Sequence, residues 1–152
     1  MRFEYFYGGQ SEYFSFYRIP RQLVTGAEFC DLSTDAKLLY GMMLDRMGLS
    51  LKNGWHEEDG RVYIYYTVEE IAEDLNCGRE KAIRLVAELD ESKGFGLIFR
   101  KRQGQGKPTK IYVKRFASRE ITEKGRGSEV GKPDFKKSEY PTSRGRKNRR
   151  KL

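Results

Sequence analysis

Histidine and cysteine are scarce in this sequence, which limits the chemistry that it can perform. The 152 residues include one histidine, His56, and two cysteines, Cys30 and Cys77. The cysteines are far apart and match no metal-binding spacing, and with one histidine they are too few for the four ligands of a structural zinc site. We therefore expect no bound metal and a reduced chain in the cytoplasm.

Catalytic groups are scarce as well. A nuclease needs a carboxylate cluster or paired histidines to hold its metal ion, and a nicking enzyme of the His-x-His type needs two neighbouring histidines besides its tyrosine. Glu57, Glu58 and Asp59 follow His56, and we interpret this acidic stretch as a solvated loop; a weak metal site there is the alternative. The prediction is a binding protein without enzymatic activity and without a cofactor.

Long apolar runs are also lacking. No stretch approaches the roughly 20 residues of a membrane-spanning helix. The first seven residues have no continuous apolar core and do not form a signal peptide. We expect no membrane partner, in keeping with a cytoplasmic location.

Positive charge is abundant but unevenly distributed. The formal charge is +8, yet residues 1–116 carry 18 Lys and Arg against 17 Asp and Glu. Residues 117–152 carry 12 against 5, include the basic run 144–151, and have few apolar residues. Such a composition is typical of disorder. We predict a folded domain over 1–116 and a disordered basic tail or linker over 117–152.

Aromatic residues crowd the N-terminus. Residues 3–7 and 13–17 are rich in Phe and Tyr, and Gly8-Gly9-Gln10-Ser11 between them supplies a turn. This pattern predicts an N-terminal aromatic β-hairpin, so residues 1–20 would form a β-hairpin extension of the domain. Because an isolated hairpin is barely stable, it either packs on its own domain or forms a self-association surface.

The next part of the chain predicts a core helix and a strand. Ser33 is a good N-cap for a helix over 33–47, in which apolar residues recur at helical spacing. A short helical turn is expected at 22–25. Turn signals at Asn53-Gly54 lead to a strand over 61–66, which is rich in β-branched and aromatic residues.

Two helical patterns with a short connection follow. Residues 67–70 form a capping box that opens a helix over 68–75. The connection 76–78 leads to a second helix over 79–91, whose predicted buried residues are Ala82, Ile83, Val86 and Leu89. Two short helices joined in this way indicate a helix-turn-helix.

A basic hairpin pattern comes directly after the second helix. No acidic residue occurs between Glu91 and Glu120, whereas nine basic residues do. Strands are predicted over 97–102 and 110–116, joined by a glycine-rich turn over 103–109. Helix, helix and basic hairpin in this order predict an α+β fold, a winged helix-turn-helix that binds DNA.

Candidate DNA contacts lie on the second helix and on the hairpin. In a helix-turn-helix the second helix enters the major groove, where arginine can read guanine and glutamate can accept from cytosine. Basic turn residues can position the protein on phosphates, and glutamines can reach a groove floor. The alternative is an ordinary charged surface. The predicted contacts are Arg79, Glu80, Lys81, Arg84, Lys101, Arg102, Gln103, Gln105, Lys107, Thr109 and Lys110.

Several stretches of residues 3–116 together carry a family pattern. The longest are Phe16-Tyr-Arg-Ile-Pro-Arg-Gln-Leu23 and Leu32-Ser-Thr-Asp-Ala-Lys-Leu-Leu-Tyr-Gly-Met-Met-Leu-Asp-Arg46. The shorter ones are residues 49–55, 60–66, 88–89, 96–98, 102–104 and 111–113. In this order they resemble the N-terminal domain of the plasmid replication initiator protein A family.

The resemblance implies a winged-helix domain that recognises repeated sites at a plasmid replication origin in low-GC Gram-positive bacteria. It also implies a homodimer, with the recognition helix around 79–84 and the wing around 102–110. Family members start theta-mode replication by bringing host replication proteins to the origin, usually through a C-terminal domain beyond a linker. This sequence stops at Leu152 within the basic tail, so we expect host proteins to need a C-terminal domain that it does not include.

The predicted function is therefore sequence-specific binding of double-stranded DNA at origin repeats, which initiates plasmid replication. Two alternatives stay open: a winged-helix transcriptional regulator and a protein-interaction module of the primosome type. Direct repeats at an origin would favour the initiator and inverted repeats the regulator, whereas a lack of DNA binding at moderate salt would favour the interaction module.

The predicted disorder of residues 117–152 has a thermodynamic consequence. Deleting this segment should leave the melting temperature nearly unchanged, because a disordered segment contributes no packed surface to the folded state. Thermal denaturation followed by circular dichroism measures this directly. A large drop in melting temperature would show that the segment packs on the domain.

Overall fold

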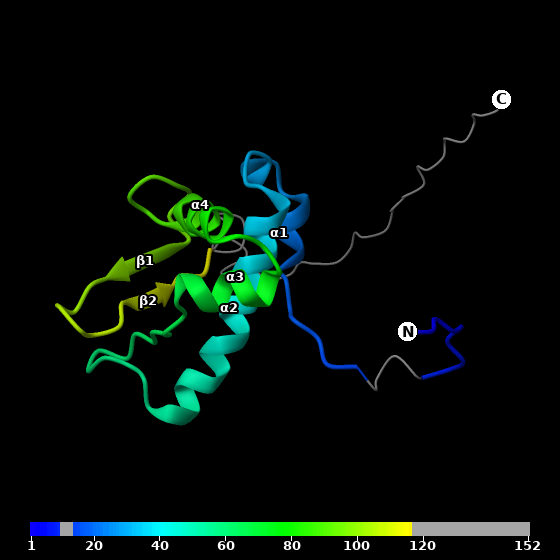
Figure 1. The fold of residues 1–152 in the computed structure, drawn as a ribbon, viewed down its shortest axis with the longest axis horizontal. Coiled ribbons are helices and arrows are strands. Elements are labelled where there is room, and N and C mark those ends of the chain that lie inside the picture. Colours follow the sequence, from blue (N-terminus) through cyan, green and yellow to red (C-terminus); the bar gives the residue numbers. More distant parts are fainter. Residues whose placement is uncertain (10–13, 117–152) are drawn as a thin grey trace, which may run out of the picture. The chain divides into compact units, whose positions relative to one another are not determined.

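A computed structural model describes residues 1–9 and 14–116 (Figure 1). Its contacts divide the chain into two units, Met1–Arg115 and Phe116–Leu152. The predicted basic tail, residues 117–152, lies outside the described residues. Within the described residues, no helix has the length and apolar character needed to cross a membrane. The elements of the first unit are α1 (Arg21–Thr25), the 3-10 helix η2 (Ala27–Phe29), α2 (Thr34–Asn53), α3 (Val68–Leu75), α4 (Arg79–Leu89), β1 (Ile98–Lys101) and β2 (Lys110–Val113).

Helix α2 is the long central helix of the unit. It begins as predicted at Ser33, whose Oγ accepts a hydrogen bond from the Ala36 N–H at 3.1 Å. The predicted end at residue 47 is wrong, because the helix continues through Gly48 to a left-handed Gly54 with φ 75°. A single glycine inside a helix costs only about 1 kcal/mol. Gly48 leaves the backbone hydrogen bonds of the helix intact, so α2 continues past it and ends at the left-handed Gly54.

A glycine in α2 allows a close backbone approach. A Cβ atom at Gly41 would lie 2.7 Å from Cγ1 of Ile19 and 3.1 Å from the carbonyl oxygen of Arg18. The segment that leads into α1 therefore crosses α2 at a position where only glycine fits without a shift. This crossing anchors residues 18–19 to the buried centre of the unit.

Helix α3 forms as predicted and α4 begins as predicted, with a tight connection between them. Both hydrogen bonds of the capping box are present at the start of α3, between Thr67 and Glu70. Asn76 adopts a left-handed conformation with φ 55°, and the Cys77 N–H donates to the Ala72 carbonyl oxygen at 3.0 Å. These local contacts end α3 and turn the chain into α4 within three residues.

The buried face of α4 differs from the prediction at one position. Ile83 is 42% exposed, whereas Leu85 is buried in its place. The remaining apolar residues already complete a stripe at i, i+3, i+4 and i+7, and Ile83 lies about 100° away from Ala82 around the helix. The residues of α4 that enter the core are Ala82, Leu85, Val86 and Leu89.

Strands β1 and β2 form the predicted antiparallel hairpin, but they are shorter than expected. Ile98 pairs with Val113 and Lys101 with Lys110 at the two ends of the ladder. Helix α4 also ends earlier than predicted, at Leu89, because Asp90 is extended and the Glu91 N–H donates to the Ile98 carbonyl oxygen. The early end of α4 places the start of the hairpin directly beside it (Figure 1).

The strand predicted over 61–66 is not formed as a continuous strand. Ile64 exchanges two backbone hydrogen bonds with Ile111 of β2, at 2.8 and 3.0 Å, and this is a single bridge. The next carbonyl, that of Tyr65, accepts from the guanidinium of Arg46 at 3.0 Å. Because Ile64 directs both its backbone groups at β2, the Tyr65 carbonyl points away from β2. A side chain of α2 binds it there, where the segment leads into α3.

The N-terminal aromatic β-hairpin predicted over 1–20 is wrong for the residues that the structure describes. Residues 1–9 and 14–19 contain no strand, and their aromatic side chains are exposed. The rings of Phe6 and Phe14 lie edge to face with centroids 5.8 Å apart. Ring contacts without a covering layer do not stabilise a two-stranded ladder. Part of the predicted turn, residues 10–13, lies outside the described residues.

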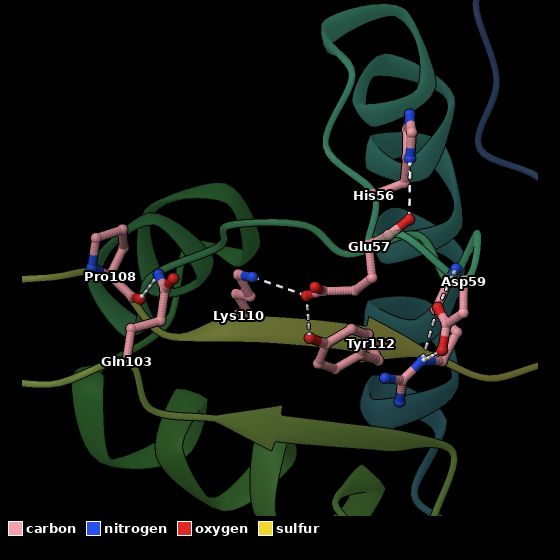
Figure 2. A network of polar contacts seen from close by, with 8 residues as sticks. His56, Glu57, Asp59, Gln103, Pro108, Lys110 and Tyr112 are labelled. Atoms are coloured by element: carbon pink, nitrogen blue, oxygen red, sulfur yellow. Dashed lines mark hydrogen bonds and ion pairs between the residues drawn. The ribbon is translucent and has the colours of Figure 1, made fainter.

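A carboxylate from the 55–60 loop ties this loop to β2 (Figure 2). Glu57 Oε2 accepts from Lys110 Nζ at 2.7 Å and from the Tyr112 hydroxyl at 2.5 Å. The ammonium group also lies 4.4 Å from the centroid of the Tyr63 ring. The Glu57 side chain is 25% exposed and that of Lys110 is 16% exposed, so the interpretation of Glu57 as part of a solvated loop is wrong.

These contacts shift the pKa values of both partners. The hydrogen bond from Lys110, followed by that from Tyr112, lowers the pKa of Glu57 from 4.5 to about 2. The same hydrogen bond to Glu57 raises the pKa of Lys110. The pair therefore stays ionised across the physiological pH range and holds the loop against the hairpin.

Replacing Glu57 by glutamine should lower the stability of the domain in a pH-dependent way. The pKa of Glu57 is depressed in the folded state, so the contact stabilises fully above its ordinary value of 4.5 and is lost as the pH falls towards about 2. Urea unfolding of the full chain and of Glu57→Gln between pH 7 and pH 3 should show a gap that narrows below about pH 4.5. The matched control is Glu58→Gln, an exposed neighbour with no ion pair in the described part of the chain. A gap that does not change with pH would mean that the charge of Glu57 is unimportant.

Candidate nucleic-acid interface

A hollow lies between α3, α4 and the β1–β2 hairpin. Its volume is about 510 Å³. The hollow brings together one predicted contact of α4, Arg79, with three of the hairpin. Cations from two separate elements therefore face one concave surface, to which an anionic ligand can bind from both sides. The hairpin residues concerned are Arg102, Lys107 and Thr109.

The cations around this hollow differ in how they are paired. Arg79 Nε lies 3.0 Å from Glu69 Oε2, and both side chains are largely exposed. Such an exposed pair is weak, so Arg79 can exchange its partner for another anion. Neither Arg102 nor Lys107 has an ion pair among the described residues. These two cations keep their full attraction for an external anion.

A partly buried pair at the back of the hollow fixes the hairpin to the end of α4. Arg100 donates to Asp90 Oδ2 at 2.9 Å, and the Ser92 hydroxyl donates to the same oxygen at 2.8 Å. Burial acts to raise the pKa of Asp90, but the hydrogen bonds from Arg100 and Ser92 outweigh it, so the pKa lies below its usual value. Arg100 lines the hollow but is missing from the predicted contacts. The sequence feature that could have identified it is the basic run Arg100-Lys101-Arg102.

The outward face of α4 carries two charged side chains without partners. Glu80 and Arg84 are exposed, and neither makes an ion pair within residues 1–9 and 14–116. They are four positions apart and therefore lie on the same side of the helix. Both predicted groups are thus free to contact a ligand that lies along α4.

Lys81 does not share this outward face. Its Nζ lies 2.7 Å from Asp35 Oδ2 of α2, and this hydrogen bond raises the pKa of Lys81. Glu88 lies on the same flank and accepts from the backbone N–H and the hydroxyl of Ser33, at 3.0 and 2.9 Å. The structure assigns Lys81 to the contact between α4 and α2, which joins residues too far apart in the sequence to be paired by a local pattern.

The predicted hairpin residues divide between the two faces of the ladder. Successive side chains of a strand alternate in direction. Arg100 and Ile111, a register pair, line the hollow. Lys101 and Lys110 form the next register pair, and Lys110 is bound to Glu57 on the opposite face. Lys110 is therefore already neutralised within the protein, although it was predicted to contact phosphate.

The tip of the hairpin is shaped by its glycines and by one glutamine. Gly104 and Gly106 have φ values of 118° and 80°, a region that other residues rarely adopt. Gln103 donates from Nε2 to the Pro108 carbonyl oxygen at 2.6 Å, so its amide closes the turn (Figure 2). Gln105 lies exposed between the glycines. Of the two glutamines, Gln105 is the one that is free at the tip.

A metal site at the His56 loop was an alternative from the sequence. The His56 Nδ1 atom faces the Glu57 carbonyl oxygen at 3.2 Å. Among residues 1–9 and 14–116, no group of three or more His, Cys, Asp or Glu side chains is placed to hold a metal ion.

Solved structures with a similar fold connect this arrangement to known proteins. A structure described as the N-terminal domain of a DNA binding protein is 31% identical, with a TM-score of 0.62, and the match covers 85% of this chain and 100% of that one. A structure of a Rep–DNA complex is 32% identical with a TM-score of 0.61, over 86% and 100% of the two chains. A structure of an MDR initiator is 29% identical with a TM-score of 0.58, over 84% and 100%.

A sequence relative and a family model also match this chain. A 41 kDa protein of Lactobacillus helveticus is 31% identical over 104 residues. The match covers 64% of this chain but only 29% of the relative, so the chain spans less than a third of that protein's length. The family model for the N-terminus of replication initiator protein A (RepA) matches residues 15–124. The chain therefore belongs to the replication initiator protein A family and corresponds to its N-terminal region.

Proposed function

We propose that this chain binds double-stranded DNA sequence-specifically through a winged helix-turn-helix and thereby serves the initiation of plasmid replication. In this proposal α4 is the recognition helix in the major groove, and the β1–β2 hairpin is the wing on the phosphate backbone. The observation that carries the proposal is the unpaired charge that the fold displays: Glu80 and Arg84 on α4, Arg102 and Lys107 on the wing. The similarity to the solved Rep–DNA complex supports the same reading.

The distribution of charge fits a recognition helix that contacts bases and a wing that contacts phosphates. Backbone contacts position a protein on DNA, whereas contacts to base edges provide sequence specificity. The cations of the wing lie around a concave surface that suits a phosphate chain, and α4 combines an acidic with a basic side chain that suits base edges. The proposal contains no catalytic step and no cofactor.

The finer parts of the proposal concern the DNA site and the assembly. We propose that the sites are repeats at a replication origin and that the protein binds them as a homodimer. The exposed aromatic side chains near the N-terminus supply one surface that self-association would cover, among them Phe3, Tyr5, Phe6 and Phe16. Host replication proteins would be recruited by a domain beyond this sequence, since the chain matches only 29% of its longer relative.

Selection of bound fragments from a random or plasmid-derived DNA pool tests the proposal. Enrichment of direct repeats from an origin would support the initiator function. Inverted repeats from a promoter region would instead indicate a transcriptional regulator with the same fold. A lack of any binding at moderate salt would overturn the proposal and favour a protein-interaction module.

Neutralising the two unpaired cations of the wing should weaken binding to all DNA sequences. Arg102→Gln with Lys107→Gln removes up to two phosphate contacts, so the salt dependence of log K should flatten by up to roughly two units. Titration of labelled DNA at several salt concentrations measures this slope on the full chain. The control variant Lys37→Gln with Lys52→Gln removes the same charge from α2 and should leave the slope unchanged. Equal slopes for both variants would show that the wing does not touch phosphate.

Replacing Arg84 by alanine should instead reduce sequence discrimination. A bidentate contact between arginine and guanine contributes about 1–3 kcal/mol of discrimination against the wrong base. Competition of the selected site against random DNA should therefore show a loss on the selected site alone. Arg21→Ala, which removes an exposed arginine of α1, is the matched control and should keep the discrimination of the original chain. Equal losses on both DNAs would contradict a base-reading role.

A further inference from the structure

An exposed isoleucine stands on the part of α4 that the proposed function places in the major groove. Ile83 is 42% exposed, although β-branched aliphatic residues are usually buried. The core does not need it, because four other apolar residues of α4 already complete the buried stripe. Ile83 is the exposed large apolar side chain of α4, so the proposed docking of this helix places an apolar group beside the bases.

The neighbours of Ile83 show which way it faces. It follows Arg79 by four positions and Glu80 by three, so it shares a side of the helix with both. Arg79 lines the hollow beside the wing. Lys81 and Glu88 lie on the other flank, where both contact α2. Ile83 thus lies between the outward face of α4 and the flank that faces the wing, and its side chain is partly exposed there.

We propose that Ile83 recognises thymine through its C5-methyl group. Thymine is the base that presents a methyl group in the major groove, and an apolar side chain is the natural partner for it. A β-branched side chain in a helix is almost confined to one rotamer, so little side-chain entropy is lost on contact. The inference rests on the proposed function and adds to it an apolar contact beside the charged readers Glu80 and Arg84.

Substitution of thymine by deoxyuracil in the selected DNA site tests this inference. The replacement removes only the C5-methyl group and keeps every hydrogen-bonding group of the base. For the full chain, we expect deoxyuracil at one thymine to weaken binding about fourfold, the effect of burying one methyl group. The Ile83→Ala variant should bind the thymine and deoxyuracil sites equally well. Selection with this variant should also relax the preference for thymine at the same position.

Two control variants separate this contact from a general loss of binding or folding. Arg84→Ala should weaken specific binding yet keep the ratio between the thymine and deoxyuracil sites. Leu49→Ala removes an exposed aliphatic side chain from α2 and should change neither quantity. A circular dichroism melt should show that Ile83→Ala is folded, as expected for a substitution at an exposed position.

Three results would overturn the inference. They are equal binding of thymine and deoxyuracil sites by the unmodified chain, the same ratio after Ile83→Ala, or a selected site without thymine in the segment protected by α4. Failure of the proposed function gives a different result, because the unmodified chain would then bind no selected DNA at all. That result would overturn both the proposed DNA binding and the thymine contact.

Discussion

The packing of α4 against α2 and α3 is the constraint on which the rest of the structure depends. Four apolar side chains of α4 enter the core, and the buried Ile71 of α3 is part of the same core. Two polar contacts, from Lys81 to Asp35 and from Ser33 to Glu88, hold one flank of α4 on α2. Packing along two sides determines which face of α4 points outward, and the proposed function assigns DNA binding to that face.

The same rigidity determines which cations are free. Arg100 and Lys110 are bound to partly buried carboxylates, Asp90 and Glu57, and these pairs hold the hairpin to α4 and to the 55–60 loop. Removing one partner of such a pair leaves a desolvated charge, so these contacts are structural. The unpaired cations at the hairpin tip then produce a local positive field in a domain that is close to neutral overall.

Short-range signals in the sequence predicted the helix-turn-helix and the hairpin well. The capping box at Thr67 and the left-handed turn at Asn76 involve residues within one or two turns of each other, so a single segment contains all the information. The N-terminal hairpin was predicted from equally local signals and is wrong for the described residues. Aromatic strands and a glycine turn do not form a ladder unless another layer covers them.

Caps and turns in the sequence therefore indicate where α2, α3 and α4 begin, and the sequence also determines how charge is distributed along the chain. The tertiary structure alone decides what each side chain of the candidate interface does. Lys81 and Lys110 carry the same charge as Lys107, yet they pair with carboxylates that lie 46 and 53 residues away in the sequence, and the Lys110 pair is the more buried of the two. For Ile83 the difference runs the other way. The helical periodicity predicted that it is buried, but the packing of its neighbours leaves it exposed. Long-range contacts of this kind depend on how the elements are oriented in space, which no local pattern specifies.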